Sequence, residues 1–153
     1  MLHFRYTSTI AAPLATVWAF HERPDVLEQL TPPWQPVRVL RREGGLAVGA
    51  ISEFELWLGP LPVRWLARHT ACEPPYLFVD EQVEGPLEFW QHRHEFTPAG
   101  NQTRLTDAIA YALPGGELVE TLVGWWVEAR LQDMFAYRHQ VTQTACLAAV
   151  QVP

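Results

Sequence analysis

The stretch PGGELVETLVGWWVEARLQDMFAYRHQVTQTACLAAV, residues 114–150, decides the fold. Proline and glycine end the preceding segment, and from residue 117 to residue 150 neither occurs again except for Gly124. Apolar residues recur there at helical spacing, namely Leu118, Leu122, Trp125 or Trp126, Ala129, Met134, Tyr137 and Val141. The pattern predicts one long amphipathic helix of roughly eight turns or more, at 3.6 residues per turn.

The sequence before this helix predicts mostly strands. Residues 2–10 alternate apolar and polar side chains, as a half-buried strand does. Prolines then open two short helical segments, at 13–22 and 24–30, and TPPW at 31–34 ends the second. Turn signals separate six further strand-like segments, which are 36–42, 50–58, 62–72, 76–83, 87–97 and 102–113. Their short turns predict antiparallel neighbours.

This order of elements predicts an α+β fold in two layers. We expect a curved antiparallel sheet of about seven strands around a long C-terminal helix, with two short helices after the first strand. The length of 153 residues predicts a single domain over residues 1–153. If the sheet curls around the helix, the space between them becomes a cavity.

Composition narrows the classes of partner. The net charge is −6 and the basic residues are all arginine, with no positive stripe of the kind that nucleic acid or an anionic membrane surface requires. No apolar run approaches the ~20 residues that span a bilayer, and residues 1–13 lack the apolar core of a signal peptide. We therefore expect a cytoplasmic protein without membrane insertion.

The sequence offers no familiar cofactor motif. Cys72 and Cys146 match no metal or redox spacing, and there is no phosphate-binding loop or nucleophile motif. We expect no cofactor and no metal. The Tyr137–Arg138–His139 run lies late in the predicted helix, where it is typical of an exposed charged turn or a partner surface.

Polar side chains fall on the inward face of two neighbouring predicted strands. The inward positions are Trp90, His92, His94 and Phe96 on one strand and Leu105, Asp107, Ile109 and Tyr111 on the next. A four-residue turn at 98–101 would pair residue 97 with residue 102 and set His92 opposite Asp107. Such cross-strand partners lie about 5 Å apart at Cβ.

Several stretches carry a family resemblance. They are ERPDVLEQLTPPW (22–34), GPLPVRWLARHTACEPPYLFVDEQVEGPLEFWQHRHEF (59–96), LTDAIAYALPGG (105–116) and MFAYRH (134–139). The chain resembles the START/Bet v1-like (SRPBCC) superfamily, whose fold is the helix grip, and within it the bacterial polyketide cyclase/dehydrase-like branch. The superfamily contains lipid and sterol carriers, hormone receptors, plant allergens and cyclases. Some branch members are fused to a nucleotide-sugar-epimerase-like domain.

The resemblance also implies which face of the strand at 76–83 lines the cavity. Its Phe78, Asp80 and Gln82 match a family pattern in which these positions point inward. The expected ligand-binding set is then Asp80, Gln82, Trp90, His92, His94, Asp107 and Tyr111, with Trp34 at the rim of the cavity.

The predicted function is binding of a hydrophobic small molecule, of lipid, polyketide or aromatic type, in this cavity. A first alternative is a cyclase/dehydratase-type enzyme in which Asp107 holds His92 or His94 as a general base. A second is a non-catalytic interaction module, for example a homodimer, whose cavity is filled by tryptophan side chains. The polar residues could also form a purely structural hydrogen-bonded network, or a metal site of two histidines and an aspartate, for which their spacing is a weak signal.

Overall fold

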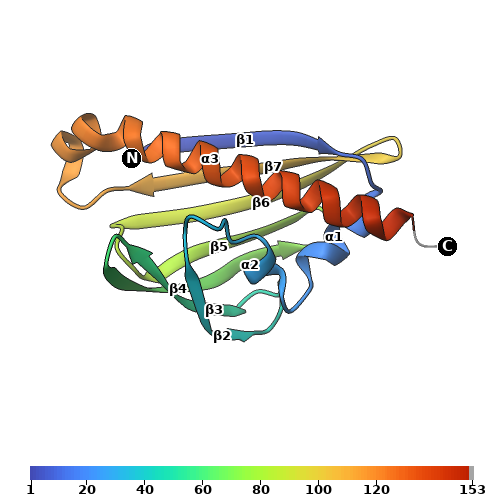
Figure 1. Cartoon of the computed structure of the whole chain (residues 1–153), viewed down its shortest axis with the longest axis horizontal. Coiled ribbons are helices and arrows are strands. Elements are labelled where there is room, and N and C mark those ends of the chain that lie inside the picture. The colour runs from blue at the N-terminus through green and yellow to red at the C-terminus, as the bar shows by residue number, and fades with distance from the viewer. Residues whose placement is uncertain (152–153) are drawn as a thin grey trace.

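The computed structural model describes residues 1–151, which form an antiparallel sheet crossed by one long helix (Figure 1). The strands are β1 (Leu2–Ile10), β2 (Val37–Glu43), β3 (Ile51–Leu58), β4 (Leu61–Glu73), β5 (Leu77–Glu84), β6 (Phe89–Ala99) and β7 (Gln102–Ala112). The helices are α1 (Leu14–His21), α2 (Val26–Gln29) and α3 (Gly116–Val150). This confirms the predicted helix-grip architecture. Over residues 1–151, no helix combines the length and the apolar composition that crossing a membrane requires.

The two short helices connect strands at opposite edges of the sheet. The sheet runs β1-β7-β6-β5-β4-β3-β2, so the first two strands of the chain lie at opposite edges. Helices α1 and α2 connect them, and α1 packs beside the C-terminal part of α3. β1 pairs with β7, the last strand of the chain. The other neighbours in the sheet, from β2 to β7, follow one another in sequence and are joined by short turns, as the proline and glycine signals indicate.

The register of β6 against β7 differs from the predicted one. The strands continue through Ala99 and Gln102, which face each other, so the turn is only Gly100–Asn101 and the predicted four-residue turn is wrong. Gly100 has a φ of 64°, which glycine adopts without steric cost. His94, and not His92, therefore lies opposite Asp107, while His92 pairs with Ile109. The inward face of each strand is unchanged, because the shift is by an even number of residues.

The helix α3 turns a different face to the sheet than its apolar pattern predicts. Its buried residues are Gly124, Leu131, Phe135, His139, Thr142 and Cys146, whereas Leu118, Leu122, Trp125 and Trp126 are exposed. The reason lies at Gly124, where a Cβ atom would come within 3.3 Å of the Leu2 side chain. So close an approach leaves no room for the neighbouring indoles between helix and sheet.

The core consists of two apolar clusters. One gathers around α1 and includes Ile10, Trp18, Phe96, Leu105 and Cys146. The other lies nearer the start of α3 and includes Phe4, Trp90, Ile109, Tyr111 and Phe135. Each of β1, β6, β7 and α3 contributes residues to both clusters. In each of these elements, a few residues therefore lie between the part that joins one cluster and the part that joins the other.

Candidate functional site

The segments between the two clusters carry the polar residues of the interior. On β7 the buried residue between Leu105 and Ile109 is Asp107, and on β6 the inward residues between Phe96 and Trp90 are His94 and His92. On α3, the buried polar residue between Phe135 and Cys146 that faces Asp107 is His139. On β1, Ser8 contacts His139. We call Asp107, His92, His94, His139 and Asp80 the polar band.

Asp107 is the centre of the polar band. Its Oδ1 lies 2.7 Å from Nε2 of His92 and 2.9 Å from Nδ1 of His94, and its Oδ2 lies 2.6 Å from Nε2 of His139. Burial alone would raise the pKa of this carboxyl, but hydrogen bonds from the three imidazoles lower the pKa well below its usual range. Asp107 is therefore a buried anion held by three donors from two elements.

His94 bridges the two carboxylates of the band. Its Nδ1 faces Asp107, and its Nε2 lies 3.3 Å from Oδ1 of Asp80 on β5. Although burial lowers the pKa of His94, the contacts with Asp107 and Asp80 raise it above the usual value. Because both ring nitrogens point at carboxylate oxygens, the imidazolium is the form that satisfies both contacts.

His92 lies against His94, and its pKa is shifted in the opposite direction. The ring centroids are 3.7 Å apart. Burial and the neighbouring His94 lower the pKa of His92, although Asp107 and Asp80 act in the opposite direction. The pKa values of the two rings are therefore shifted in opposite directions, as expected where two titratable groups share a site.

A chain of hydrogen bonds leads from the polar band to β1. Ser8 Oγ lies 2.6 Å from Nδ1 of His139, and the other nitrogen of that ring faces Asp107. If His139 donates from Nε2 to the carboxylate, its Nδ1 accepts from the serine hydroxyl. This chain fixes the orientation of the His139 ring between α3 and the sheet.

A small, partly open cavity adjoins the polar band on its α3 side. It has a volume of about 20 Å³, which is room for one water molecule. Its lining residues are His21, Leu30, His94, Leu105, Asp107, Phe135, Arg138, His139 and Thr142. Six of the nine lining residues have polar side chains.

A larger, open groove lies next to this cavity. It has a volume of about 420 Å³ and is lined by Gln29, Tyr137, Gln140, Val141, Thr144 and Ala145. Four of the residues that line the groove, Gln29, Tyr137, Gln140 and Val141, are direct sequence neighbours of residues that line the cavity, both at the end of α2 and on α3. The Trp34 side chain, 58% exposed, contacts Tyr137 edge to face with 5.4 Å between ring centroids.

The structure brings four of the expected site residues together, namely Asp80, His92, His94 and Asp107. The others lie elsewhere. Gln82 bonds through its side chain to both backbone groups of Leu87 and so holds the turn between β5 and β6. Trp90 and Tyr111 pack in the second apolar cluster.

Sequence reasoning missed three ionisable residues that line the cavity, His139, Arg138 and His21. His139 and Arg138 point inward, so the expectation of an exposed charged turn at residues 137–139 is wrong. A signal for His139 was present, because it follows Leu131 and Phe135 at four-residue steps and so shares their face. His21, at the end of α1, gave no signal beyond its type.

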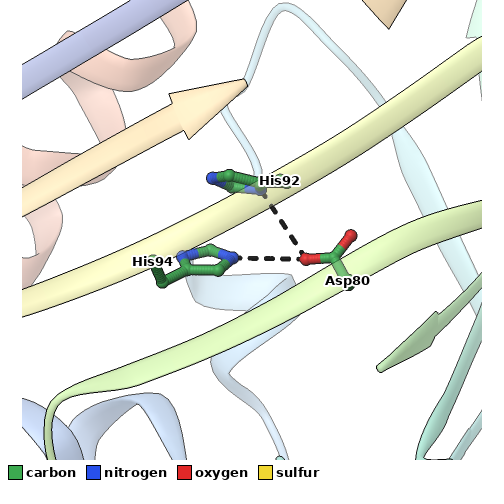
Figure 2. Close-up of side chains that lie close together, drawn as sticks. All are labelled: Asp80, His92 and His94. Carbon is green, nitrogen blue, oxygen red and sulfur yellow. Dashed lines mark hydrogen bonds and ion pairs between the residues drawn. The ribbon is translucent and has the colours of Figure 1, made fainter. Parts of the chain in front are cut away.

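Asp80, His92 and His94 could hold a divalent cation. They offer three ligand atoms that all lie within 4.8 Å of one another, the one such set within residues 1–151 (Figure 2). In that arrangement the nitrogens of His92 and His94 that face Asp107 would carry the hydrogens, and the other two would bind the ion. Asp107 would then orient both rings, a common arrangement around metals.

Comparisons with solved structures agree with the fold. A protein from Thermus thermophilus is 21% identical, with a TM-score of 0.75 over 97% of this chain and 99% of that one. Norcoclaurine synthase from Thalictrum flavum, solved as a point mutant with a transition-state analogue, is 13% identical, with a TM-score of 0.75 over 98% and 96% of the two chains. At these identities the likeness shows the fold alone.

A third similar structure belongs to a much longer protein. The nucleoside-diphosphate sugar epimerase from Corynebacterium glutamicum is 27% identical, with a TM-score of 0.67. The match covers 94% of this chain but only 28% of the epimerase, so this chain resembles one part of that larger protein. Among curated proteins, none matches this chain.

The family itself is settled by the sequence pattern of residues 10–139. Over this range, which includes the polar band and most of α3, the chain matches the sequence model described as polyketide cyclase/dehydrase and lipid transport. The chain therefore belongs to the polyketide cyclase/dehydrase and lipid transport family of the SRPBCC superfamily.

Proposed function

We propose that this protein binds a hydrophobic small molecule, of lipid, polyketide or aromatic type, between the sheet and α3. The observation that carries the proposal is the polar cavity of about 20 Å³ set between two apolar clusters. Binding sites for small molecules combine apolar walls with a few placed polar groups. Here Phe135 and Leu105 supply the walls, while Arg138 supplies a polar group.

The cavity must widen to admit such a ligand. The groove beside it, at about 420 Å³, lies within the usual range of ligand sites, roughly 300 to 1,000 Å³. A ligand whose body lies in the groove needs only the end of α2 to move for its polar end to reach the cavity. α2 is four residues long, and Trp34 beyond it contacts α3 through Tyr137, so this segment suits a movable cover.

A matched pair of variants tests this site. Thr144 and Thr121 are both exposed on α3, and each hydroxyl bonds to the carbonyl four residues earlier. Thr144 lines the groove and Thr121 lies on the first half of the helix. We expect saturable binding of the neutral dye Nile red, followed by its fluorescence. Thr144→Trp should weaken it about tenfold, because an indole fills the groove, and Thr121→Trp should leave it unchanged.

Two results would count against the proposal. Wild-type protein that shows no saturable dye binding would favour the interaction module with a filled cavity. Equal effects of the two tryptophan variants would move binding away from the groove. Native mass spectrometry of the purified protein, with an organic extract of the same sample, would then identify any ligand that it retains.

The second candidate is a cyclase/dehydratase-type enzyme that uses His92 or His94 with Asp107. The close contacts of both rings with a buried carboxylate favour it, since such contacts orient a general base. However, both nitrogens of His94 face carboxylates, and His92 does not line the cavity. No lone pair of either ring is thus directed at a ligand, and we place binding first. A rate that depends on the ionisation of a histidine and is lost in both His92→Ala and His94→Ala would reverse this order.

A further inference from the structure

We infer that Arg138 binds an oxyanion of the ligand, so that the preferred ligands are hydrophobic carboxylic acids. The inference rests on the proposed function and specifies it, because it names the chemical group that enters the cavity. It is carried by the hydrogen bonds of Arg138, by the charges around the cavity, and by the size of the cavity.

Arg138 stands out among the buried polar groups. Its Nε is shielded from solvent and is the one buried side-chain nitrogen or oxygen within residues 1–151 that has no hydrogen-bond partner. The guanidinium carbon lies 5.3 Å from the centre of the Phe135 ring, which offers a cation a weak partner but accepts no conventional hydrogen bond. Leaving such a donor unpaired is costly, and in native proteins it usually indicates a missing water, ion or ligand.

An arginine on the exposed face of the same helix, Arg130, forms an ion pair and so contrasts with Arg138. Arg130, two turns earlier, forms an ion pair with Asp133 at 2.9 Å. No carboxylate of the described chain lies within ion-pair distance of Arg138, although Asp107 and Asp80 are near enough to act on it through space. Burial therefore lowers the pKa of Arg138, as expected for a cation that lacks a close counter-charge.

The charges that line the cavity favour an anion. One permanently cationic side chain faces it, that of Arg138. The one carboxylate that faces it, Asp107, already has both oxygens engaged by imidazole nitrogens. Asp80 does not line the cavity. An oxyanion placed there meets a free guanidinium, whose planar set of N–H groups matches a carboxylate.

The dimensions suit a ligand that reaches in with one polar end. The cavity holds about one water molecule, so a carboxylate oxygen can take the place of that water while Leu30 shifts to admit the rest of the group. The apolar body would then lie in the groove, along Tyr137 and Val141. We therefore expect a linear or narrow hydrophobic acid to fit better than a neutral molecule of the same shape.

The test compares three twelve-carbon probes, dodecanoic acid, methyl dodecanoate and dodecan-1-ol, as competitors of bound Nile red at pH 8. In wild-type protein we expect the acid to compete about tenfold more tightly than the alcohol or the ester, since a charge-assisted hydrogen bond replaces a neutral one. In Arg138→Gln this ratio should fall to about one while the dye still binds. Arg138→Lys should keep part of the preference, and Arg130→Gln on the exposed face should keep all of it.

Each outcome separates the inference from the proposed function. If the acid and the alcohol compete equally in wild-type protein, the oxyanion site is wrong and hydrophobic binding stands. If the preference persists in Arg138→Gln, the anion is bound elsewhere. If neither dye nor probe binds to wild-type protein, both proposals fail. Circular dichroism checks that each variant is folded, and should Arg138→Gln fail to fold, the wild-type ratio and the Arg138→Lys variant decide.

Discussion

The two halves of α3 have opposite relations to the sheet. In what we call the second half, residues 131–150, Leu131, Phe135 and His139 follow one another at four-residue steps and are all buried. In the first half, Gly124 is the buried residue, while Trp125 and Trp126 are 70% and 54% exposed. The half with the larger apolar side chains is therefore the half that buries fewer of them.

The difference shows that the partner surface decides which face of a helix is buried. The second half lies over the inner sides of β1 and β7, where Asp107 and Ser8 meet His139. The first half meets the sheet at the beginning of β1, where Leu2 contacts Gly124 and the amino terminus pairs with Glu120 at 3.0 Å. A small residue at the contact permits close packing there and turns the large ones outward.

Truncation of one aromatic side chain in each half is the most direct test of this contrast. Phe135 is 1% exposed and contacts Phe4 and His92. Phe135→Ala should lower the free energy of unfolding by about 3–5 kcal/mol, the usual loss for a buried phenylalanine. Trp126→Ala should change it by only about 0.5 kcal/mol. Urea denaturation of both variants measures the difference.

Similar losses in these two variants would contradict the contrast. In particular, a large loss for Trp126→Ala that depends on protein concentration would indicate that the first half is covered by a second copy of the chain. Such a result would support the homodimer among the interaction-module alternatives, because the stability of a dimer depends on protomer concentration.

Removal of the central carboxylate tests the polar contacts of the second half. Asp107→Ala leaves three buried imidazoles without their acceptor, and we expect a loss of about 3–4 kcal/mol, as when one partner of a buried ion pair is deleted. Asp107→Asn keeps the shape and one acceptor oxygen, so its loss should be about half as large. A loss below about 1 kcal/mol for Asp107→Ala would mean that the band contributes little to stability, which favours a functional role.

The sequence predicts the strands well because prolines and glycines mark nearly every turn. It fails at Pro98, which resembles a turn residue but continues β6, and this error shifts the predicted register. It also fails for α3, since Trp125 and Trp126 dominate the apolar pattern. The actual inward stripe contains Gly124 and Thr142, which periodicity does not distinguish from surface residues.

The site residues on the strands could be predicted from the sequence, whereas those on α3 could not. His92, His94 and Asp107 lie on adjacent strands, so alternation and strand order were enough to group them, whereas the inward orientation of Asp80 followed from the family resemblance. The contribution of α3 to the site depends on how the helix is rotated against the sheet. That rotation is a property of tertiary packing, and no local pattern contains it.

Acid should destabilise the protein through His21, which lines the cavity opposite the second half of α3. Burial lowers its pKa from 6.5 to about 4, although its bond to the Val17 carbonyl acts the other way; His94, Asp107 and His139 are the ionisable groups near it. Between these values the unfolded chain binds a proton that the folded one does not, so stability falls as the pH falls from 6.5 to about 4.

The size of this effect is about 3 kcal/mol, at 1.36 kcal/mol per pKa unit. His21→Asn keeps a donor for the Val17 carbonyl but does not titrate, so its stability should vary less between pH 7 and pH 4. His3→Asn, on the exposed face of β1, is the matched control and should follow wild-type protein. Parallel curves for His21→Asn and wild-type protein would show that His21 takes up its proton equally in both states.

The smallest expected effect lies at the boundary between the halves. Gly124→Ala removes a residue that costs a helix about 1 kcal/mol, but its new Cβ would stand 3.3 Å from the end of the Leu2 side chain. Because that end is flexible, a shift of a few tenths of an ångström suffices, and we expect a net gain of about 0.5 kcal/mol. Gly124→Val places branched carbons at the same contact and should reverse the sign. Thermal unfolding of the two variants tests how closely α3 approaches β1. A gain in stability for both variants would mean that Trp125 and Trp126 point outward for some reason other than this close contact.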